Sequence, residues 1–441
     1  MKCLWVAALS SVLGCAPPPP REPPPAAARP KPNDAEAGAE RVAGDILGEM
    51  LEGVHGPYAD RSLQSYVDRV GRRVARVASR PEIDWRFHIT DDREVDARAL
   101  PGGRIVISRA ALACLGSEAE LGAVLAHEVA HVTLDHASVR KRALPARDDP
   151  ESGELEQLLD ADEERQADAL AVRYLRQAGY DPRAVGRALD ALRRSVVFEC
   201  RQETERRDCD SLRDPSDPHP AWPTRLARVA LVAGTAGGEE GRDRYLSHID
   251  GLVFGEGREA PRFVHGRFEA GGGPSIALPK GANAELSGAV LTSTGLGPSI
   301  VIVRAHGPLW KRMLLEALQK STHSVREISG WHTVVGSFGD QSGASAHAAL
   351  LDAAPFIYLI AVAGGSDGSR ELLEQLLASV RPASPVKPRV RVLRIARARR
   401  PTTLGKLCPN TSARLADALN PMREDRAVSA GTRVKCIEGE P

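Results

Sequence analysis

The stretch AVLAHEVAHVTLDH, residues 123–136, decides the fold of this chain. It places one glutamate and three histidines in a run of alanine, valine and leucine that is otherwise typical of a buried helix. In a helix, residues four apart lie one above the other, so His127 and His131 can both reach one ion. His136 lies about half a turn out of phase with them, and we expect it at the surface or in a supporting position.

The residue that follows the first histidine completes a chemical pattern. His-Glu-x-x-His on a helix is typical of zinc proteases, in which both histidines bind the metal and the glutamate acts as general base. Glu128 has that place here. The alternative is that these are ordinary core residues. Because burying two imidazoles and a carboxylate without partners would cost several kcal/mol, and one zinc ion would engage all three groups, we favour the metal site.

A catalytic zinc site uses three protein ligands and a water, so a third ligand must come from another element. DADEERQADALAVRYL, residues 160–175, is a predicted helix that offers one. Glu164 is the predicted third ligand, and Asp168 on the same face should accept the distal N–H of a ligand histidine. The small residues Ala161 and Ala171 would permit close approach. Three charged residues are expected on a solvated face: Glu163, Arg165 and Arg173.

Two strands are predicted ahead of the histidine helix. IDWRFHIT, residues 83–90, alternates apolar and polar residues as a half-buried strand does. A Pro-Gly-Gly turn leads into the second strand, and Ser117 with Glu120 forms a capping box that should begin the helix. We expect the second strand to have a free edge, to which an extended polypeptide substrate adds as a further strand. Its residues are Gly103, Arg104, Ile105, Val106 and Ile107.

Three segments in this order resemble a known family: 95–136, which contains the opening stretch, 163–184, EERQADALAVRYLRQAGYDPRA, and 219–225, HPAWPTR. They are similar to the gluzincin metallopeptidases of the CAAX-prenyl-endopeptidase/HtpX class (metallopeptidase family forty-eight), and most similar to soluble periplasmic members of the BepA or LoiP kind. The resemblance covers about residues 36–235 and implies a mainly helical zincin-type domain with a small sheet. Asp96 replaces the family's usual asparagine, and the membrane helices and helical repeats of other members are missing.

The resemblance implies a role for each matched residue. Glu128 would be the general base. His219 would approach the metal or the oxyanion of the reaction, and Arg225 would position that histidine or bind the intermediate. Zinc, one ion per chain, would be held by His127, His131 and Glu164.

The first residues, MKCLWVAALSSVLGC (1–15), resemble the signal peptide of a bacterial lipoprotein. The apolar run is too short to span a bilayer and ends at Cys15, the expected site of lipidation. A plain signal peptide that contains a cysteine is the alternative. Residues 16–35 form a proline-rich linker that could hold a domain roughly 50 Å from the membrane. We therefore expect a periplasm-facing lipoprotein of the bacterial envelope, and Ala16 favours the outer membrane.

Beyond the peptidase-like region, residues 36–235, the sequence contains both predicted strands and predicted helices, so we expect a multidomain α+β protein. Residues 236–275 would be a connector. Residues 276–384 would form a small α+β accessory domain that positions substrate or binds a partner. Residues 385–441 resemble a LysM module, which would bind peptidoglycan, and a small adaptor domain is the alternative.

Cysteines at short spacing are candidate disulfides in an oxidising compartment. Two pairs are expected, Cys200 with Cys209 and Cys408 with Cys436, and Cys114 is left over in an apolar helix. None of these cysteines has the spacing of a metal site. The net charge of +1 gives no sign of a nucleic-acid partner.

These observations predict a lipid-anchored, zinc-dependent endopeptidase that hydrolyses unfolded or misassembled envelope proteins. The competing hypothesis is a latent or non-hydrolytic envelope module, either a zinc-containing chaperone or a peptidoglycan binder. It would gain support if His219 ligated zinc as a fourth protein group, because a closed site has no place for a water.

Overall fold

The structure is a computed structural model that describes residues 34–136, 152–203 and 222–439, with short gaps in the last range. The gaps are 236, 258–259, 288, 296–297, 320–322, 340–344, 364–366, 384–389 and 421–426. Four features of the sequence therefore lie outside the described residues: the signal peptide with Cys15, the proline-rich linker before residue 34, Cys209 of the expected Cys200–Cys209 pair, and His219. Helices and strands are mixed along the chain, which agrees with the expected α+β class.

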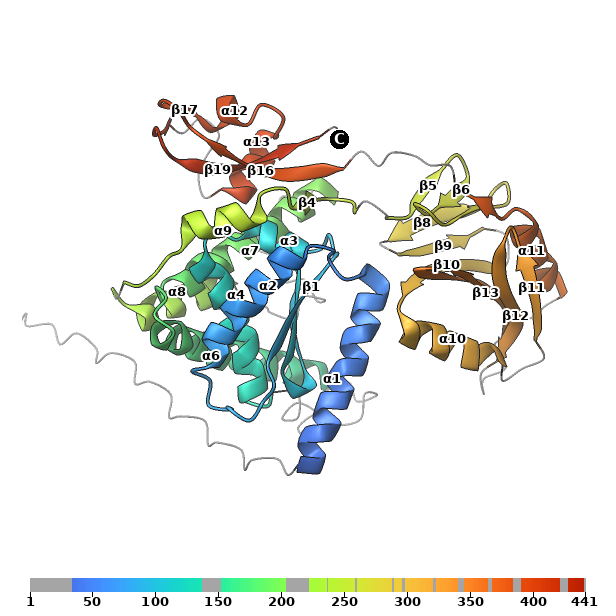
Figure 1. The fold of residues 1–441 in the computed structure, drawn as a ribbon, viewed down its shortest axis with the longest axis horizontal. Coiled ribbons are helices and arrows are strands. Elements are labelled where there is room, and N and C mark those ends of the chain that lie inside the picture. Colours follow the sequence, from blue (N-terminus) through green and yellow to red (C-terminus); the bar gives the residue numbers. More distant parts are fainter. Residues whose placement is uncertain are drawn as a thin grey trace, which may run out of the picture. The chain divides into compact units, whose positions relative to one another are not determined.

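Several helices surround a small sheet in the region expected to be the peptidase (Figure 1). They are α1 (Asp34–His55), α2 (Arg61–Ala75), α3 (Arg109–Cys114), α4 (Glu118–Thr133), α6 (Ser152–Gln177), α7 (Ala184–Glu203), α8 (Trp222–Ala233) and α9 (Arg242–Ile249). The start of α4 is confirmed, because the Ser117 hydroxyl accepts the N–H of Glu120 at 3.2 Å. The Glu120 carboxylate in turn accepts the N–H of Gly116, one residue earlier than in a standard capping box.

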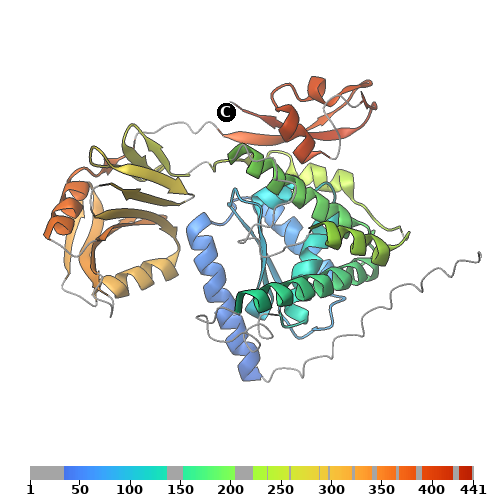
Figure 2. The ribbon, with the colours of Figure 1, turned by 180° about the vertical axis from the view of Figure 1, so that it is seen from behind.

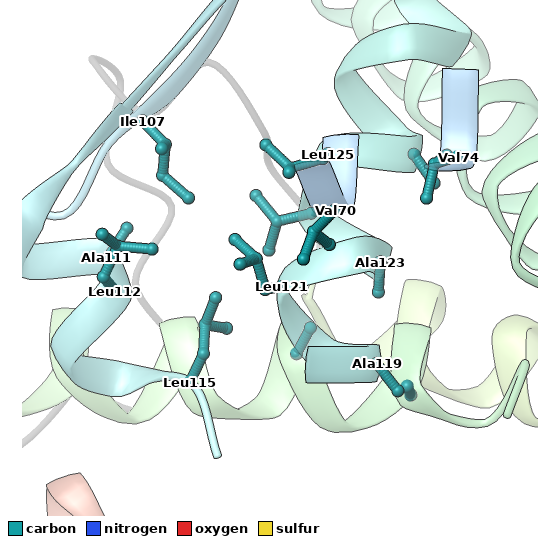
Figure 3. Packing of buried hydrophobic residues seen from close by; sticks show 14 of the residues in the cluster. Val70, Val74, Ile107, Ala111, Leu112, Leu115, Ala119, Leu121, Ala123 and Leu125 are labelled. Carbon is teal, nitrogen blue, oxygen red and sulfur yellow. The ribbon is translucent and has the colours of Figure 1, made fainter. Parts of the chain in front are cut away.

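The helix α4 lies within the main apolar core. Every residue from Glu118 to Ala130 is buried, as expected for a helix that is apolar on most of its faces. Figure 3 shows Leu121 and Leu125 of α4 in one cluster with Val70 of α2 and Ile107 of the sheet. Because both leucines are 0% exposed, replacing either with alanine would cost about 2–5 kcal/mol. This packing fixes the face on which α4 presents its histidines.

The small sheet has the strand order β1-β3-β2, with β1 (Arg86–Thr90), β2 (Ala97–Leu100) and β3 (Arg104–Ser108). β3 pairs in parallel with β1 and antiparallel with β2, so both of its edges are hydrogen-bonded. The free edge predicted along Gly103, Arg104, Ile105, Val106 and Ile107 is therefore wrong. Among the described residues, no strand pairs with the outer edge of β2.

The turn between β2 and β3 explains this arrangement. Pro101–Gly103 forms one turn of 3₁₀ helix, in which Gly102 and Gly103 have φ angles of 68° and 83°. Only glycine adopts these angles without steric cost. The turn folds β2 back onto β3 and leaves β3 in the centre of the sheet.

A second sheet fills most of the region expected to be the accessory domain. Its order is β11-β12-β13-β14-β10-β9-β8, and all neighbouring pairs are antiparallel. The strands are β8 (Asn283–Ser287), β9 (Val290–Thr294), β10 (Ser299–His306), β11 (Ser324–Ile328), β12 (Trp331–Gly339), β13 (Ser345–Ala353) and β14 (Phe356–Ala363). The same region contains two helices, α10 (Pro308–Gln319) and α11 (Asp367–Ala378), so strands and helices are mixed here.

The helices α10 and α11 cover opposite faces of this sheet (Figure 2). Along β13, Ala349 and Leu351 share a core with α11, whereas Ala348 and Leu350 share one with α10. Alternate residues of a strand face opposite sides, so both faces of the sheet are buried. A four-stranded sheet adjoins this region, in the order β15 (Arg381–Pro382), β7 (Pro274–Ala277), β6 (Arg267–Glu269) and β5 (Arg262–Val264).

The last part of the chain pairs with the connector. β16 (Arg391–Arg397) lies between β19 (Arg433–Glu438) and β4 (Val253–Phe254). The other elements here are β17 (Thr402–Thr403), α12 (Leu404–Leu407), α13 (Ala413–Leu419) and β18 (Ala427–Val428). Cys408 and Cys436 form a disulfide, the pairing that the sequence predicts, with Cα atoms 5.2 Å apart.

Lys435 of β19 joins this part of the chain to the main core. Its Nζ donates to the carbonyl oxygens of Ala113, Cys114 and Leu115 at 2.8, 2.8 and 2.9 Å. These carbonyls end α3, which leads into α4, so the Lys435 amine caps that helix end. Leu415, Leu419 and Ile437 also pack into the main core.

No helix in the described part of the chain combines the length and apolar character that crossing a membrane requires.

Candidate metal centre

Two packed helices bring the candidate ligands together. His127 and His131 lie on the same face of α4, and α6 packs against that helix. Ala167 and Ala171 of α6 are 0% exposed, so small side chains do allow a close approach. Ala161 is exposed and does not have the spacing role expected for it.

The three predicted ligands fit one metal ion. The Nε2 atoms of His127 and His131 lie 3.0 Å apart, and the carboxylate oxygens of Glu164 lie 3.3 Å from the first and 3.1 Å from the second. Zinc binds nitrogen and carboxylate oxygen at about 2.0–2.2 Å in tetrahedral geometry, which places neighbouring ligand atoms about 3.3 Å apart. Two imidazoles and a carboxylate are also a donor set that zinc prefers.

Both histidine rings are held on the side away from this centre. Nδ1 of His127 lies 3.1 Å from the Asp168 carboxylate, and Nδ1 of His131 lies 2.8 Å from Nδ1 of His136. Contacts of this kind fix the tautomer and orientation of a ligand histidine. Asp135, just after α4, has a φ of 57°, which lies in the left-handed region. This turn accompanies the contact between the rings of His136 and His131. His136 is only 5% exposed, so the surface position is wrong and the supporting position is confirmed.

Arg225 of α8 is buried and contacts two carboxylates of the site. Its Nε and Nη2 each donate to Asp168 at 2.8 Å, and its Nη1 lies 2.8 Å from Oε2 of Glu164. The expected contact of Arg225 with His219 or with a reaction intermediate stays a prediction, because His219 lies outside the described residues. A bidentate Arg–carboxylate pair is rigid as well as strong, so Arg225 fixes the positions of Asp168 and Glu164.

The charges around the site favour a cation. Burial by itself would lower the pKa of His127, but the carboxylates of Glu164 and Asp168 outweigh it and raise the pKa to about 10. Burial would raise the pKa of Asp168, but hydrogen bonds from Arg225 and His127 lower it to about 2. The attraction that favours a proton on His127 would equally favour a divalent metal ion.

Glu128 and Glu163 are both buried, each with 3% exposure. Glu128 lines the same cavity as His127, a place that suits a general base. The expectation that Glu163 lies on a solvated face is wrong, because the buried face of α6 is wide and includes Ala167, one turn further on. Arg165 and Arg173 are exposed as expected.

A His-Glu-x-x-His helix with a glutamate ligand from a second helix defines a metallopeptidase centre of the zincin class. The comparison with protein families agrees with this class. Residues 61–144, which include α2, the small sheet and α4, match the model of peptidase family M48. The resemblance seen in the sequence is thereby confirmed for this part of the chain.

Three relatives have informative names. The mitochondrial metalloendopeptidase OMA1 of Schizosaccharomyces pombe is 33% identical over 105 residues, which cover 22% of this chain and 30% of the relative. The beta-barrel assembly-enhancing protease of Escherichia coli K12 is 25% identical over 183 residues, 35% of this chain and 38% of the relative. The protein of that name from Yersinia pestis is 29% identical over 97 residues, 22% and 20% of the two chains. The match thus spans well under two thirds of each relative.

Proposed function

We propose that the chain is a zinc-dependent metalloendopeptidase. The observation that carries this proposal is the group of His127, His131 and Glu164, whose ligand atoms all lie within 4.8 Å of one another. Zinc bound there would lower the pKa of a coordinated water toward ~7 and polarise a substrate carbonyl.

The side chains around the ligands would perform the remaining steps. Glu128 takes a proton from the attacking water and returns it to the leaving amine. Asp168 and His136 keep the two ligand rings in orientation, and Arg225 keeps the carboxylates in place. For His219, the resemblance supports a role at the metal or at the oxyanion.

We propose that the polypeptide substrate binds along β2 instead of β3. Val95 and Asp96, which precede β2, and Ala97, its first residue, line the cavity together with His127 and Glu128. A substrate that adds a strand to the outer edge of β2 is recognised through its backbone. This mode of binding requires an extended chain, which supports unfolded or misassembled proteins as substrates.

The biological setting proposed here is protein quality control in the bacterial envelope. The lipoprotein-like segment 1–15 supports a lipid anchor on Cys15 that faces the periplasm, at the outer membrane. Relatives named beta-barrel assembly-enhancing protease support the envelope. Residues 276–384 would position substrate or bind a partner, and the LysM-like residues 385–441 would bind peptidoglycan.

Cleavage of unfolded casein by the purified full chain tests the peptidase proposal. We expect cleavage that a chelator abolishes, that added zinc restores and that Glu128→Gln reduces at least about 1,000-fold, with zinc still bound. Chelator-insensitive cleavage, or full activity in the variant, would remove the proposed mechanism. A zinc-loaded protein that cleaves nothing would favour the non-hydrolytic chaperone or cell-wall binder.

A further inference from the structure

We propose that an exposed group of arginines near the end of the chain binds the phosphate headgroups of an anionic lipid membrane. This group, the cationic tip, consists of Arg397 at the end of β16 and of Arg399 and Arg400 in the turn that follows (Figure 1). It shares no residue with the candidate metal centre, and the inference does not depend on peptidase activity.

The charge of the chain is unevenly distributed. Residues 385–441 contain 13 lysines and arginines but only 5 aspartates and glutamates, although the whole chain has a net charge of only +1. The excess of positive charge is therefore confined to this part of the chain, and the rest is acidic. A strong local excess of one sign favours association with a partner of the opposite sign.

The three arginines of the cationic tip are exposed to solvent. Within the described ranges, no carboxylate forms an ion pair with any of them. A neighbouring arginine of the same strand differs in this respect, because Nε of Arg394 lies 3.5 Å from the Glu438 carboxylate. Glu438 ends β19 and pairs with Val392, so it lies at the end of the sheet away from the tip. The positive charge of the tip is thus available to an external anion.

Two arginines oppose each other on neighbouring strands. Arg397 of β16 pairs directly with Arg433 of β19, and like charges in this position destabilise an antiparallel pair. Arg433 has a local acceptor, because its Nη1 donates to the carbonyl oxygen of Asp243 at 2.8 Å and lies 3.5 Å from the Asp243 carboxylate. An anion bound at the tip would compensate the charge of Arg397 in the same way.

The backbone beneath the tip is fixed by hydrogen bonds. The N–H of Ala398 donates to the carbonyl oxygen of Thr432 at 3.0 Å, and the N–H of Gly431 donates to that of Ala398 at 2.7 Å. Ala398 is 1% exposed and belongs to the same small core as the Cys408–Cys436 disulfide. The arginines therefore extend from an ordered turn, so little backbone entropy is lost when they bind.

The composition of residues 385–441 favours a lipid surface over a nucleic acid. The segment contains no phenylalanine, tyrosine or tryptophan, whereas proteins that bind single-stranded nucleic acid combine basic residues with aromatic side chains on which bases stack. An anionic membrane requires only exposed basic side chains, each of which strengthens binding about fivefold. A basic surface also adds to a lipid anchor as a second membrane signal, which agrees with the anchor proposed at Cys15.

Vesicle binding by the full chain tests the tip. The chain carries Cys15→Ser, so that no attached lipid contributes, and cosedimentation measures its affinity for two kinds of vesicle. One kind is phosphatidylcholine alone, which accounts for any contact of the apolar segment 1–15. The other contains about 30% phosphatidylglycerol, which gives an anionic surface.

A double variant, Arg399→Gln with Arg400→Gln, removes two charges of the tip. The matched control is Arg312→Gln with Arg370→Gln, which removes two exposed arginines of α10 and α11 and changes the net charge equally. Circular dichroism and casein cleavage check that both variants fold like the parent chain.

We expect the parent chain to bind anionic vesicles about 100-fold more tightly than neutral ones, from about fivefold for each of three arginines. The tip variant should lose about 30-fold of this affinity, whereas the control should stay within about twofold of the parent. Raising the salt from about 0.1 M to about 0.5 M should weaken binding at least about tenfold, because it screens the charges.

Three results would overturn the inference. The first is equal affinity of the parent chain for anionic and neutral vesicles. The second is an equal loss in the tip variant and the control, which would show a general effect of net charge. The third is binding to purified peptidoglycan or to single-stranded DNA that the tip variant loses, without preference for anionic vesicles, because the tip would then serve a different partner.

Discussion

Arg225 and Asp168 form a buried bidentate ion pair whose two hydrogen bonds are both 2.8 Å long. The same guanidinium reaches Glu164, so one side chain of α8 connects the third candidate ligand with the residue that holds His127. The position of α8 is thereby coupled to the geometry of the candidate metal centre.

Replacing Arg225 with lysine should weaken zinc binding. Lysine keeps the positive charge but cannot form the planar two-bond contact with Asp168. We expect the zinc affinity to fall about 10–100-fold, as it does when the groups that orient metal ligands are lost. Competition with a chromogenic chelator measures this affinity. Arg228→Lys, at an exposed position of the same helix, should bind zinc like the wild type. Equal affinities in the two variants would show that the ion pair does not support the site.

Replacing His136 with alanine should also weaken zinc binding, by roughly tenfold or more. The ring of His131 would lose the contact at its Nδ1, and with it the constraint on its tautomer. The same chelator competition measures the loss. His323→Ala, an exposed histidine of the accessory region, is the control. Unchanged affinity in His136→Ala would mean that His131 is oriented by other groups.

The sequence predicts the ligands better than their surroundings. His127, His131 and Glu164 could be found because helical spacing is a local property, and two helices with small residues can approach closely. Helical spacing does not give the position of His136, because Asp135, which has a positive φ, ends the helical register before it. The burial of Glu163 cannot be predicted from its own helix, because the width of the buried face of α6 depends on what packs against it.

The strand order could not be predicted from a local pattern. The sequence pattern of β3 predicts a strand. Its place between β1 and β2, however, depends on pairing with β1, which comes earlier in the chain, and on the turn at Gly102. The role of Lys435 is similarly non-local, because it contacts carbonyls more than 300 residues away in sequence. No spacing motif in the sequence indicates such a contact.

Glu118 should make stability depend on acidic pH. Tyr66 and Tyr180 donate to its carboxylate at 3.0 and 2.8 Å, and Arg244 donates as well. Burial raises the pKa of Glu118, but these hydrogen bonds outweigh it and lower the pKa below the ordinary 4.5. The stabilisation is therefore fully present above about pH 4.5 and is lost as the pH falls through the lower value of the folded state.

Urea unfolding of Glu118→Gln tests this network. At pH 7 we expect the free energy of unfolding to fall by about 2–3 kcal/mol, because a charge-assisted network loses its acceptor charge. Between pH 5 and about pH 3 the variant should lose less stability than the wild type. Glu49→Gln, at an exposed position of α1, should behave like the wild type. Parallel pH profiles for wild type and Glu118→Gln would contradict the pKa assigned to this carboxyl.

Lys435→Met should destabilise the main core. Three buried carbonyls at the end of α3 would lose their donor, and one unsatisfied carbonyl alone costs about 1–3 kcal/mol. We expect the free energy of unfolding to fall by about 3 kcal/mol or more, and casein cleavage to fall with it because α3 leads into α4. Urea unfolding measures the first effect. Lys406→Met, at an exposed position of α12, should change neither property. A variant Lys435→Met as stable as Lys406→Met would show that the contacts of Lys435 with the end of α3 do not support the core.

The central claim is that two imidazoles of α4 and one carboxylate of α6 hold a single zinc ion. Elemental analysis of the purified full chain measures it most directly, beside Glu164→Ala and His131→Ala variants that are checked for folding by circular dichroism. The account predicts one zinc per wild-type chain and less than about one tenth of that in the folded variants. Wild-type protein without a bound transition metal, or folded variants that retain a full equivalent of zinc, would contradict it.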